Sequence, residues 1–287
     1  MIRKPFLARF RETAVVLRRL AKLGHNPVRF TKFIPQDSEA GTWALHYRPV
    51  PASAPLPVPP KSLWLGYGRD EKTYLESGLA DVANMRSILD RAGFRFEVDG
   101  RPILDLGCGG GRMLRHLRQV AQHREVWGMD ISAPHINWLK MHLSPPFRFA
   151  VNTTIPHLSF ADGSLDLIYC GSLFTHIDDL AESWLLEVRR ILADGALLYC
   201  TLHDEHALAQ LAREPFHGLA SALREHPALT SAEPPDVFVA GYDSDSTVFY
   251  RTPYLRALFG QSFDLVEVVP AAYGYQTAWV LRKRPAR

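Results

Sequence analysis

Glycines and two aspartates lie at spacings that could build a site for a ligand containing a ribose. The glycines occupy positions 107 and 109–111, where the missing Cβ lets the backbone turn sharply and lets a ligand approach closely. Asp105 precedes this loop, and Asp130 comes 19 residues after Gly111. An acidic side chain at that spacing, at the end of the following strand, can accept hydrogen bonds from ribose hydroxyls.

Short apolar runs predict the strands that would position these residues. Residues 103–106 read I-L-D-L and residues 126–129 read V-W-G-M, a composition typical of parallel strands buried on both faces. A helical pattern begins at Arg112, so the N–H groups of its first turn would point toward the ligand. Ser132 is the predicted N-cap of a second helix, which runs to His142. This order of elements predicts an αβ domain that binds either a dinucleotide or S-adenosylmethionine (SAM).

Four segments in register over residues 101–203 resemble the class I SAM-dependent methyltransferases. The loop reads D-L-G-C-G-G-G-R, whereas dinucleotide sites carry G-x-G-x-x-G and the first motif of these methyltransferases is commonly D-x-G-C-G-x-G. Residues 160–170, F-A-D-G-S-L-D-L-I-Y-C, are similar to the family's F-x-D-G-S-F-D-L-V-Y-S. Residues 171–176, G-S-L-F-T-H, are similar to its x-x-V-F-x-H. A nucleotide-binding αβ domain of another kind is the alternative.

The resemblance implies an α/β fold: a Rossmann-like, seven-stranded, mostly parallel sheet with an antiparallel last strand, helices on both faces and a helical N-terminal extension. The rest of the chain has a pattern that agrees with this fold. Predicted strands cover residues 147–151, 165–170 and 196–202, and predicted helices cover residues 81–92 and 179–192. Residues 263–269 and 276–281 alternate in hydropathy, which predicts a closing antiparallel pair.

The resemblance also implies SAM as the cofactor. SAM has an amino acid tail whose ammonium group suits the carboxylate of Asp105, while Asp130 suits the ribose. With their neighbours at the strand ends, these residues form a predicted cofactor-binding set of eight: Asp105, Gly107, Cys108, Gly109, Asp130, Ile131, Asn152 and Gly171. Tyr74 and Gly78 form a Tyr-x-x-x-Gly segment that often lies near SAM in similar enzymes. An equally good interpretation is that Tyr74 has a purely structural role.

Two histidines are candidate catalytic bases. His203 follows the fifth predicted strand and His176 follows the fourth, so both lie at the edge of the sheet where open αβ folds bind ligands. A histidine there could remove a proton from a hydroxyl acceptor. The alternative is that each histidine only hydrogen-bonds its own loop. No metal is predicted, because His203, Asp204 and His206 have no further ligand set to complete a site.

Composition divides the chain into three predicted parts: a basic helical arm over residues 1–48, a proline-rich linker over 49–61 and the methyltransferase domain over 62–287, with residues 204–255 as an insertion that caps the substrate. Residues 1–34 hold nine Lys or Arg and one acidic residue, and residues 49–60 hold six prolines. The arm has apolar residues at helical spacing, so it either packs on the domain, which we favour, or contacts an anionic membrane surface or an acidic partner. The prolines predict an extended spacer.

The three cysteines show neither metal-site spacing nor a pairing pattern, which is typical of a reducing cytoplasm. No apolar run approaches the roughly 20 residues of a membrane span, and the N-terminus lacks the pattern of a secretory signal. We therefore expect a cytoplasmic protein, with peripheral contact to the inner membrane surface if the arm binds lipid. Nucleic acid is not an expected partner, because no aromatic-rich platform accompanies the basic arm.

These observations predict an enzyme that transfers a methyl group from SAM to a hydroxyl of a small molecule or glycan. The Asn/Asp-Pro-Pro-Tyr segment of nucleic-acid and amide N-methyltransferases is replaced by Tyr169-Cys170-Gly171-Ser172. Two alternatives stay open: a small-molecule N-methyltransferase, which an acidic, aromatic-lined pocket would favour, and a binding module that keeps the fold without catalysis. The link to glycans is an analogy with similar enzymes of surface polysaccharide assembly.

Overall fold

A computed structural model describes residues 54–177, 179–213, 234–240 and 246–285, all within the unit Tyr47–Arg287. The predicted basic arm, the first residues of the proline-rich linker and much of the predicted substrate-capping insertion lie outside the described residues. The predicted domain boundaries are therefore not tested.

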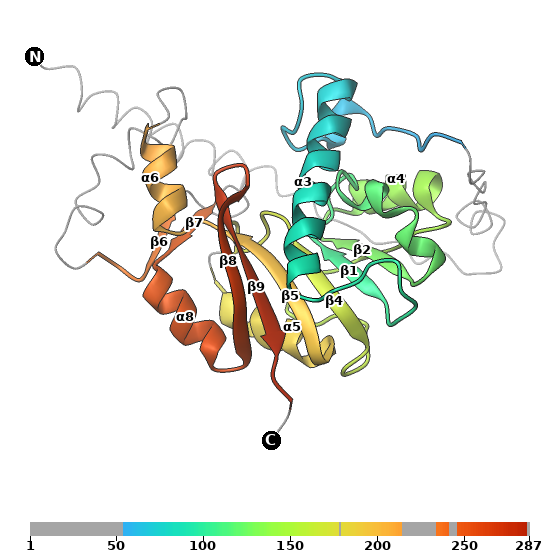
Figure 1. The fold of residues 1–287 in the computed structure, drawn as a ribbon. Helices are drawn as coiled ribbons and strands as arrows, with labels where there is room; N and C mark the ends of the chain where they lie inside the picture. Colours follow the sequence, from blue (N-terminus) through green and yellow to red (C-terminus); the bar gives the residue numbers. More distant parts are fainter. Residues whose placement is uncertain (1–53, 178, 214–233, 241–245, 286–287) are drawn as a thin grey trace, which may run out of the picture. The chain divides into compact units, whose positions relative to one another are not determined.

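The core of the fold is a seven-stranded sheet in the order β3-β2-β1-β4-β5-β9-β8 (Figure 1). The first five strands along the chain pair in parallel, and β9 pairs antiparallel with both β5 and β8. The predicted Rossmann-like sheet with an antiparallel last strand is confirmed. The strands are β1 (Ile103–Leu106), β2 (Val126–Asp130), β3 (Arg148–Val151), β4 (Leu165–Cys170), β5 (Leu192–Leu202), β8 (Phe263–Tyr273) and β9 (Gln276–Lys283).

Helices cover both faces of this sheet, which explains why its strands have so few polar residues. Side chains alternate along β4: Leu167 and Tyr169 belong to one buried cluster, and Ile168 and Cys170 belong to the other. The first cluster packs against α3 (Glu71–Arg91), α4 (Ala133–Leu143) and the 3-10 helices η3 (Leu114–Leu117) and η4 (Val120–Gln122). The second packs against α5 (Ala181–Ile191) and α8 (Thr252–Gly260).

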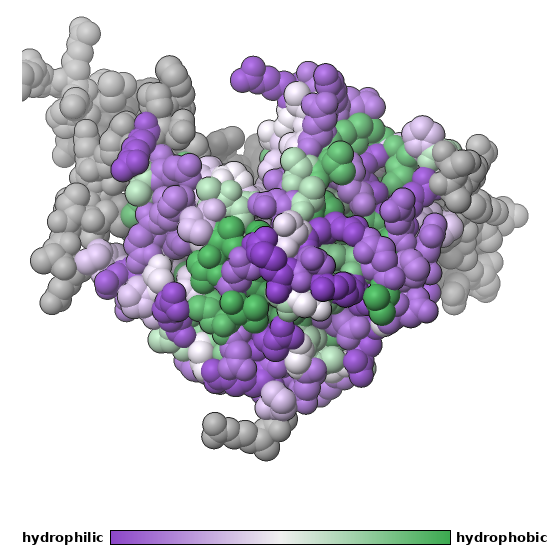
Figure 2. Space-filling view, viewed as in Figure 1, coloured by the Kyte–Doolittle hydropathy of each residue, from purple (hydrophilic) through white to green (hydrophobic). Residues whose placement is uncertain are grey.

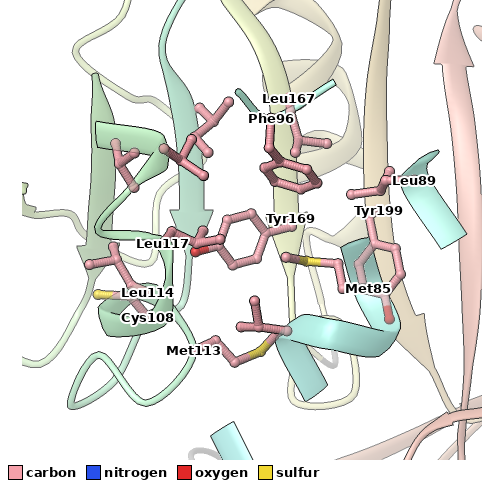
Figure 3. Packing of buried hydrophobic residues seen from close by; sticks show 14 of the residues in the cluster. Met85, Leu89, Phe96, Cys108, Met113, Leu114, Leu117, Leu167, Tyr169 and Tyr199 are labelled. Carbon is pink, nitrogen blue, oxygen red and sulfur yellow. The ribbon is translucent and has the colours of Figure 1, made fainter. Parts of the chain in front are cut away.

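Two tyrosines fill the space between the sheet and the first helical layer. Tyr199 points from β5 toward Met85 of α3, and Tyr169 points from β4 toward Leu117 (Figure 3). Both tyrosines are fully buried. The same clusters enclose the three cysteines, which are free and buried: Cys108 follows β1, and Cys170 and Cys200 are paired neighbours on β4 and β5.

Helix α3 begins at Glu71, ten residues before the helix predicted for this segment. Asp70 and Thr73 form a capping box, in which the Thr73 N–H donates to the Asp70 carboxylate (2.8 Å) and the Asp70 N–H donates to the Thr73 hydroxyl (3.1 Å). This cap supplies the start signal. Gly78 lies inside this helix, where it allows a close backbone contact described below.

The helix predicted from Arg112 is a pair of short 3-10 helices, η3 and η4. Their buried residues Leu114, Leu117 and Val120 recur every third position, which is the repeat of a 3-10 helix. Strand β5 also differs from its prediction, since it begins at Leu192. Asp194 and Gly195, which precede the strand predicted over residues 196–202, lie within β5, where Gly195 has a φ of +78° and the register with β4 shifts.

A smaller part of the described chain lies beyond β5. Helix α6 (Glu205–Arg213) is followed by a two-stranded antiparallel sheet of β6 (Val237–Ala240) and β7 (Thr247–Tyr250). Strand β7 meets the end of β5 through a bridge between His203 and Phe249. These elements lie in the predicted substrate-capping insertion.

Strand β8 forms one edge of the large sheet, where Leu265 and Val266 are 37% and 38% exposed. Figure 2 shows the hydrophobic area over this edge, bordered by hydrophilic side chains. Among the described residues, no helix is long and apolar enough to cross a membrane.

Candidate functional site

Two adjoining cavities open where β1 and β4 end. This is the point at which the strand order reverses, from β3-β2-β1 on one side to β4-β5 on the other, and open αβ sheets bind their ligands at such a point. The first cavity has a volume of about 490 Å³ and the second about 570 Å³. They share five lining residues: Gly107, Asp130, Ile131, Leu173 and His176.

The glycine loop after β1 has the backbone conformation that its composition predicted. Gly107, Gly109 and Gly111 have φ values of +81°, +50° and +73°, which residues with a Cβ rarely adopt. The N–H groups of Gly107 and Cys108 donate to the carbonyl of Met129 (2.8 and 3.0 Å). The loop is thus bonded to β2 while its inner surface lines the first cavity.

The Asp130 side chain hydrogen-bonds both the glycine loop and the segment that follows β2. One carboxylate oxygen accepts the Gly109 N–H (2.8 Å), and the other accepts the Ser132 N–H (2.8 Å). A carboxylate has about four acceptor positions, so both oxygens can also receive ribose hydroxyls. The same side chain can therefore fix the loop and hold the ligand.

Asp105 is 3% exposed and lines the floor of the first cavity. Burial raises the pKa of Asp105 to about 8, the nearby Asp130 adds to this rise, and the Tyr169 hydroxyl and Arg112 oppose it. Because an ammonium group would favour the ionised form, this carboxyl suits the amino acid end of SAM.

All eight predicted cofactor-binding residues line the cavities. Asp105, Cys108, Gly109 and Gly171 line the first cavity, Asn152 lines the second, and the other three lie between them. The Asn152 amide donates to the Thr153 carbonyl (3.0 Å), while its Oδ1 is buried without a partner in the described part of the chain. Such an atom can accept a hydrogen bond from a ligand amino group. The residues present therefore fit SAM, although their individual binding roles stay predictions.

Residues 54–68, which we call the strap, form a wall of the first cavity. Trp64 stacks on Tyr74 with ring centroids 4.8 Å apart, and its indole N–H donates to the Pro59 carbonyl (2.7 Å). Leu65 lies over the glycine loop, since a Cβ on Gly109 would be 2.9 Å from its side chain. Tyr74, which was predicted near the cofactor, thus packs against Trp64 and also lines the first cavity. Gly78 lines neither cavity.

Polar side chains hold the strap through its backbone carbonyls. Arg115 donates to the carbonyls of Leu56 and Pro57 (2.7 Å each), and Arg118 donates to the carbonyl of Ala54 (2.6 Å). The Nε2 atom of His135 lies 3.2 Å from the Leu63 carbonyl. Sequence reasoning missed these residues, because bonds to main-chain carbonyls leave no pattern in the side chains of the strap.

A second missed group of side chains lines the first cavity around Arg112. Arg112 forms an ion pair with Asp81 (2.7 Å) and donates to the Tyr273 hydroxyl (2.5 Å). Its guanidinium lies 4.0 Å from the ring centroid of Tyr67, whose hydroxyl accepts from Tyr273 (2.8 Å). Tyr67 lies between two glycines, and Tyr273 lies beside a third. Aromatic residues next to glycines were the feature of the sequence that could have indicated this part of the site.

The structure places the two candidate histidines differently. His176 is exposed and lines both cavities, and its Nδ1 lies 2.8 Å from the Ser246 carbonyl. His203 is 2% exposed and lines neither described cavity. It stacks between Phe249 and Tyr275, with centroid distances of 4.9 and 5.3 Å. Only His176 is brought to the predicted cofactor residues.

The other residues around His203 have structural partners. Asp204 accepts the Ala207 N–H (3.1 Å) and so caps α6. Glu205 accepts the Thr252 N–H (2.9 Å) at the start of α8. Within the described ranges, no group of three or more His, Cys, Asp or Glu side chains is placed to hold a metal ion.

Comparison with known proteins identifies the domain. Residues 104–200 match the model of a methyltransferase domain. The malonyl-[acyl-carrier protein] O-methyltransferase of Hahella chejuensis is 25% identical over 117 residues, covering 41% of each chain. The mitochondrial ubiquinone biosynthesis O-methyltransferase of Saccharomyces cerevisiae is 30% identical over 90 residues, covering 30% of this chain and 29% of that protein. The chain spans less than half the length of these curated relatives.

Solved structures share the fold. A SAM-dependent methyltransferase from Methanosarcina mazei is 20% identical, with a TM-score of 0.50, and covers 69% of this chain and 98% of its own. The 1,6-didemethyltoxoflavin-N1-methyltransferase of Burkholderia thailandensis, solved with S-adenosylhomocysteine, is 15% identical with a TM-score of 0.50 and covers 90% of this chain and 94% of its own. Residues 104–200 therefore carry a methyltransferase domain, and with its glycine loop, acidic strand ends and strand order the described part of the chain has the Rossmann-like fold of class I SAM-dependent methyltransferases.

Proposed function

We propose that the protein transfers a methyl group from SAM to a hydroxyl of a small molecule or a glycan. The observation that carries this proposal is the position of His176, an exposed imidazole that lines both cavities beside Gly107 and Asp130. When bound, SAM would supply an electrophilic methyl group. The part of the chain is to hold the cofactor, orient the acceptor and receive a proton.

The cofactor would be held by residues from three strand ends. Asp105 would face its ammonium group, and Asp130 would accept hydrogen bonds from its ribose. Asn152 would meet the base through its free Oδ1. The glycine loop leaves room for close approach, because Gly107 and Gly109 present no Cβ to the first cavity.

His176 has a tautomer suited to a general base. A carbonyl oxygen can only accept, so the 2.8 Å contact with the Ser246 carbonyl requires a proton on Nδ1. In the neutral ring, Nε2 then carries a lone pair. As the acceptor oxygen attacks the methyl carbon, Nε2 would take the hydroxyl proton, which is the step that such a base accelerates.

The charges in the cavities favour a hydroxyl over an amine. Three acidic side chains line them: Asp105 and Asp130 are assigned to the cofactor, and the third, Asp179, is exposed to solvent. The rings of Tyr67 and Tyr273 could attract a cationic amine, but the Arg112 guanidinium already lies over both of them, at 4.0 and 5.4 Å. The O-methyltransferase names of the curated relatives support the same choice.

The first test is calorimetric titration of the protein with S-adenosylhomocysteine, with Asp130→Ala and Arg148→Ala in parallel. We expect micromolar binding that weakens by about 1.5–3 kcal/mol in Asp130→Ala, because hydrogen bonds to a charged group are lost. Arg148 pairs with Glu125 on the surface, so its variant should bind normally. Folded protein without affinity for S-adenosylhomocysteine would contradict the proposal and favour a binding module of another kind.

The second test is a screen of hydroxyl and amine acceptors with radiolabelled SAM, followed by His176→Gln on the accepted substrate. We expect turnover of a hydroxyl compound and a fall in kcat of about 10²–10⁴ in His176→Gln, the range for a general base. The affinity for S-adenosylhomocysteine should change little. Transfer to amines alone, with His176→Gln fully active, would establish the N-methyltransferase alternative.

A further inference from the structure

The loop that carries His176 begins with a residue in an unfavourable backbone conformation. Residues 171–177 follow β4, and Ser172 has a φ of +61°. A serine in this left-handed region persists only where its surroundings hold it. After Ser172 the chain turns, and the His176 N–H donates to the Leu173 carbonyl (2.9 Å). The direction of this turn, and so the position of His176, depends on the conformation of Ser172.

A closed ring of hydrogen bonds holds Ser172 in place. The Ser172 N–H donates to the Thr201 hydroxyl (2.7 Å), and this hydroxyl donates to Oε1 of Gln276 (2.6 Å). The Gln276 amide then donates from Nε2 to the Ser172 hydroxyl (2.8 Å). Thr201 lies on β5 and Gln276 on β9, and they are 0% and 5% exposed. Three strand ends are thereby joined at one residue.

The directions of these bonds are fixed by counting donors. The Thr201 hydroxyl has one proton, which goes to Gln276, so it must accept from Ser172. Rotating the Gln276 amide by half a turn would face its NH₂ toward the Thr201 hydroxyl and its oxygen toward the Ser172 hydroxyl, and the Thr201 proton would then lose its acceptor in the ring. The Ser172 hydroxyl accepts from Gln276 and has its own proton left for Thr175, 2.9 Å away.

The ring continues to His176 through Thr175. The Thr175 carbonyl accepts the Val248 N–H (2.8 Å), and His176 donates to the Ser246 carbonyl two residues earlier on the same segment. The Tyr250 hydroxyl also donates to the Phe174 carbonyl (3.0 Å). The loop is thus bonded to β7 on one side and to the ring on the other.

We propose that Thr201 and Gln276 are positioning residues for His176. They touch neither described cavity, and they act by holding Ser172 in its left-handed conformation, so that the loop presents Nε2 of His176 toward the cavities. This inference rests on the proposed function, in which His176 is the base.

The neighbouring Thr277 is a matched control. It is 0% exposed and follows Gln276 on β9, but its hydroxyl has no hydrogen-bond partner in the described part of the chain. Thr201→Val and Thr277→Val make the same change in shape and polarity. Only the first should disturb the loop, whereas a general effect of removing a buried hydroxyl would appear in both.

The test is nuclear magnetic resonance of the histidine side chains in the full-length protein, where nitrogen shifts report the tautomer. In the wild type we expect His176 to carry its proton on Nδ1. In Thr201→Val the ratio of this tautomer to the Nε2–H form should fall about fivefold, the effect of losing one hydrogen bond of ordinary net strength. Thr201→Ser should restore it, and Thr277→Val should match the wild type. Gln276→Leu breaks the ring from β9 and should reproduce the shift.

His176 signals unchanged in both Thr201→Val and Gln276→Leu would overturn the inference. Once an acceptor is known, Thr201→Val should lower kcat about fivefold while the affinity for S-adenosylhomocysteine stays within about twofold. Failure of the proposed function is a different result: wild-type protein that does not bind S-adenosylhomocysteine, or His176→Gln with full turnover. The tautomer measurement needs neither cofactor nor acceptor, so the two failures are distinguishable.

Discussion

Burial controls the ionisation of Asp105, and this gives the cofactor site a dependence on pH. The pKa of this carboxyl is raised from the ordinary 3.8 to about 8, first by burial and then by the charge of Asp130. Because the folded protein holds the proton more tightly than the unfolded chain, this group's contribution to stability is largest at low pH. It is lost as the pH rises toward about 8.

Binding of a ligand ammonium group should favour the ionised form of Asp105 over the protonated form. We expect the affinity for S-adenosylhomocysteine to rise between pH 6 and pH 8, by at most about tenfold per pH unit, with release of a proton. Calorimetry in two buffers with different ionisation enthalpies would measure both quantities. In Asp105→Asn the affinity should be lower and independent of pH over this range. A flat profile in the wild type would mean that Asp105 does not face the ammonium group.

Some residues of the site act through local conformation and charge, and others act through contacts between distant parts of the chain. Glycines and acids at strand ends work through local conformation and charge, so the spacing of Asp105, the loop and Asp130 was enough to predict them. Thr201 and Gln276 act together although they are 75 positions apart. Neither residue has an unusual sequence context, so only the paired strands reveal that they meet.

At the scale of elements, α3 approaches the glycine loop more closely than any side chain would allow. A Cβ on Gly78 would overlap the carbonyl oxygen of Arg112. Beside this contact, the side chain of Arg112 donates to the Ser77 hydroxyl (3.2 Å) and forms its ion pair with Asp81. Gly78 is therefore a packing residue of the site, although it lies within a helix.

We expect Gly78→Ala to destabilise the protein by about 1–3 kcal/mol, the usual cost of overpacking. In an open helix the same change would stabilise by roughly 0.5–1 kcal/mol, so the sign is informative. Urea unfolding would measure it, with Glu76→Ala on the exposed side of α3 as the control. A Gly78→Ala protein more stable than the wild type would show that α3 can shift away from Arg112.

The strap is an element without regular structure over most of its length, and its attachment depends on side chains of η3. Arg115 is 5% exposed and donates twice to the strap. We expect Arg115→Met to speed dissociation of S-adenosylhomocysteine about tenfold, because bonds from a charged group are lost and the strap can move off the glycine loop. Stopped-flow fluorescence of Trp64, which lines the cavity, would follow the release. Arg148→Met should leave the rate unchanged, and an equal rate in both variants would show that the strap does not retain the ligand.

Elements with a strong hydrophobic pattern were predictable, whereas those shaped by distant contacts were not. Strand β4 was predicted over its observed range, because all of its side chains except that of Asp166 belong to one of two buried clusters. The 3-10 helices after the glycine loop looked like an α-helix, because Leu114 and Leu117 fit either repeat over so short a segment. The start of β5 was predicted too late because glycine is unfavourable inside a strand, but the observed strand passes through Gly195.

For the whole molecule, the strand order determines where the site forms. The glycine loop follows β1, Asp130 ends β2 and the His176 loop follows β4, and they meet because these three strands are adjacent in the sheet. The C-terminal strand pair completes the wall with Tyr273, and Asn84 of α3 donates to the Ala272 carbonyl beside it (2.6 Å). The resemblance predicted this topology. It could not predict the wall, because Tyr67 and Tyr273 are 206 positions apart and no local pattern joins them.

The three buried cysteines provide the molecule with internal reporters of opening. Burial raises the pKa of the Cys108 thiol in the glycine loop and of the paired Cys170 and Cys200 thiols in the centre of the sheet. A thiol reagent needs the exposed thiolate, so it can react only when the surrounding structure opens. Cys108 therefore reports local opening of the cofactor loop, and Cys170 and Cys200 report unfolding of the sheet. The rates at which the thiols of the unmodified chain are labelled can therefore distinguish local opening of the binding site from global unfolding.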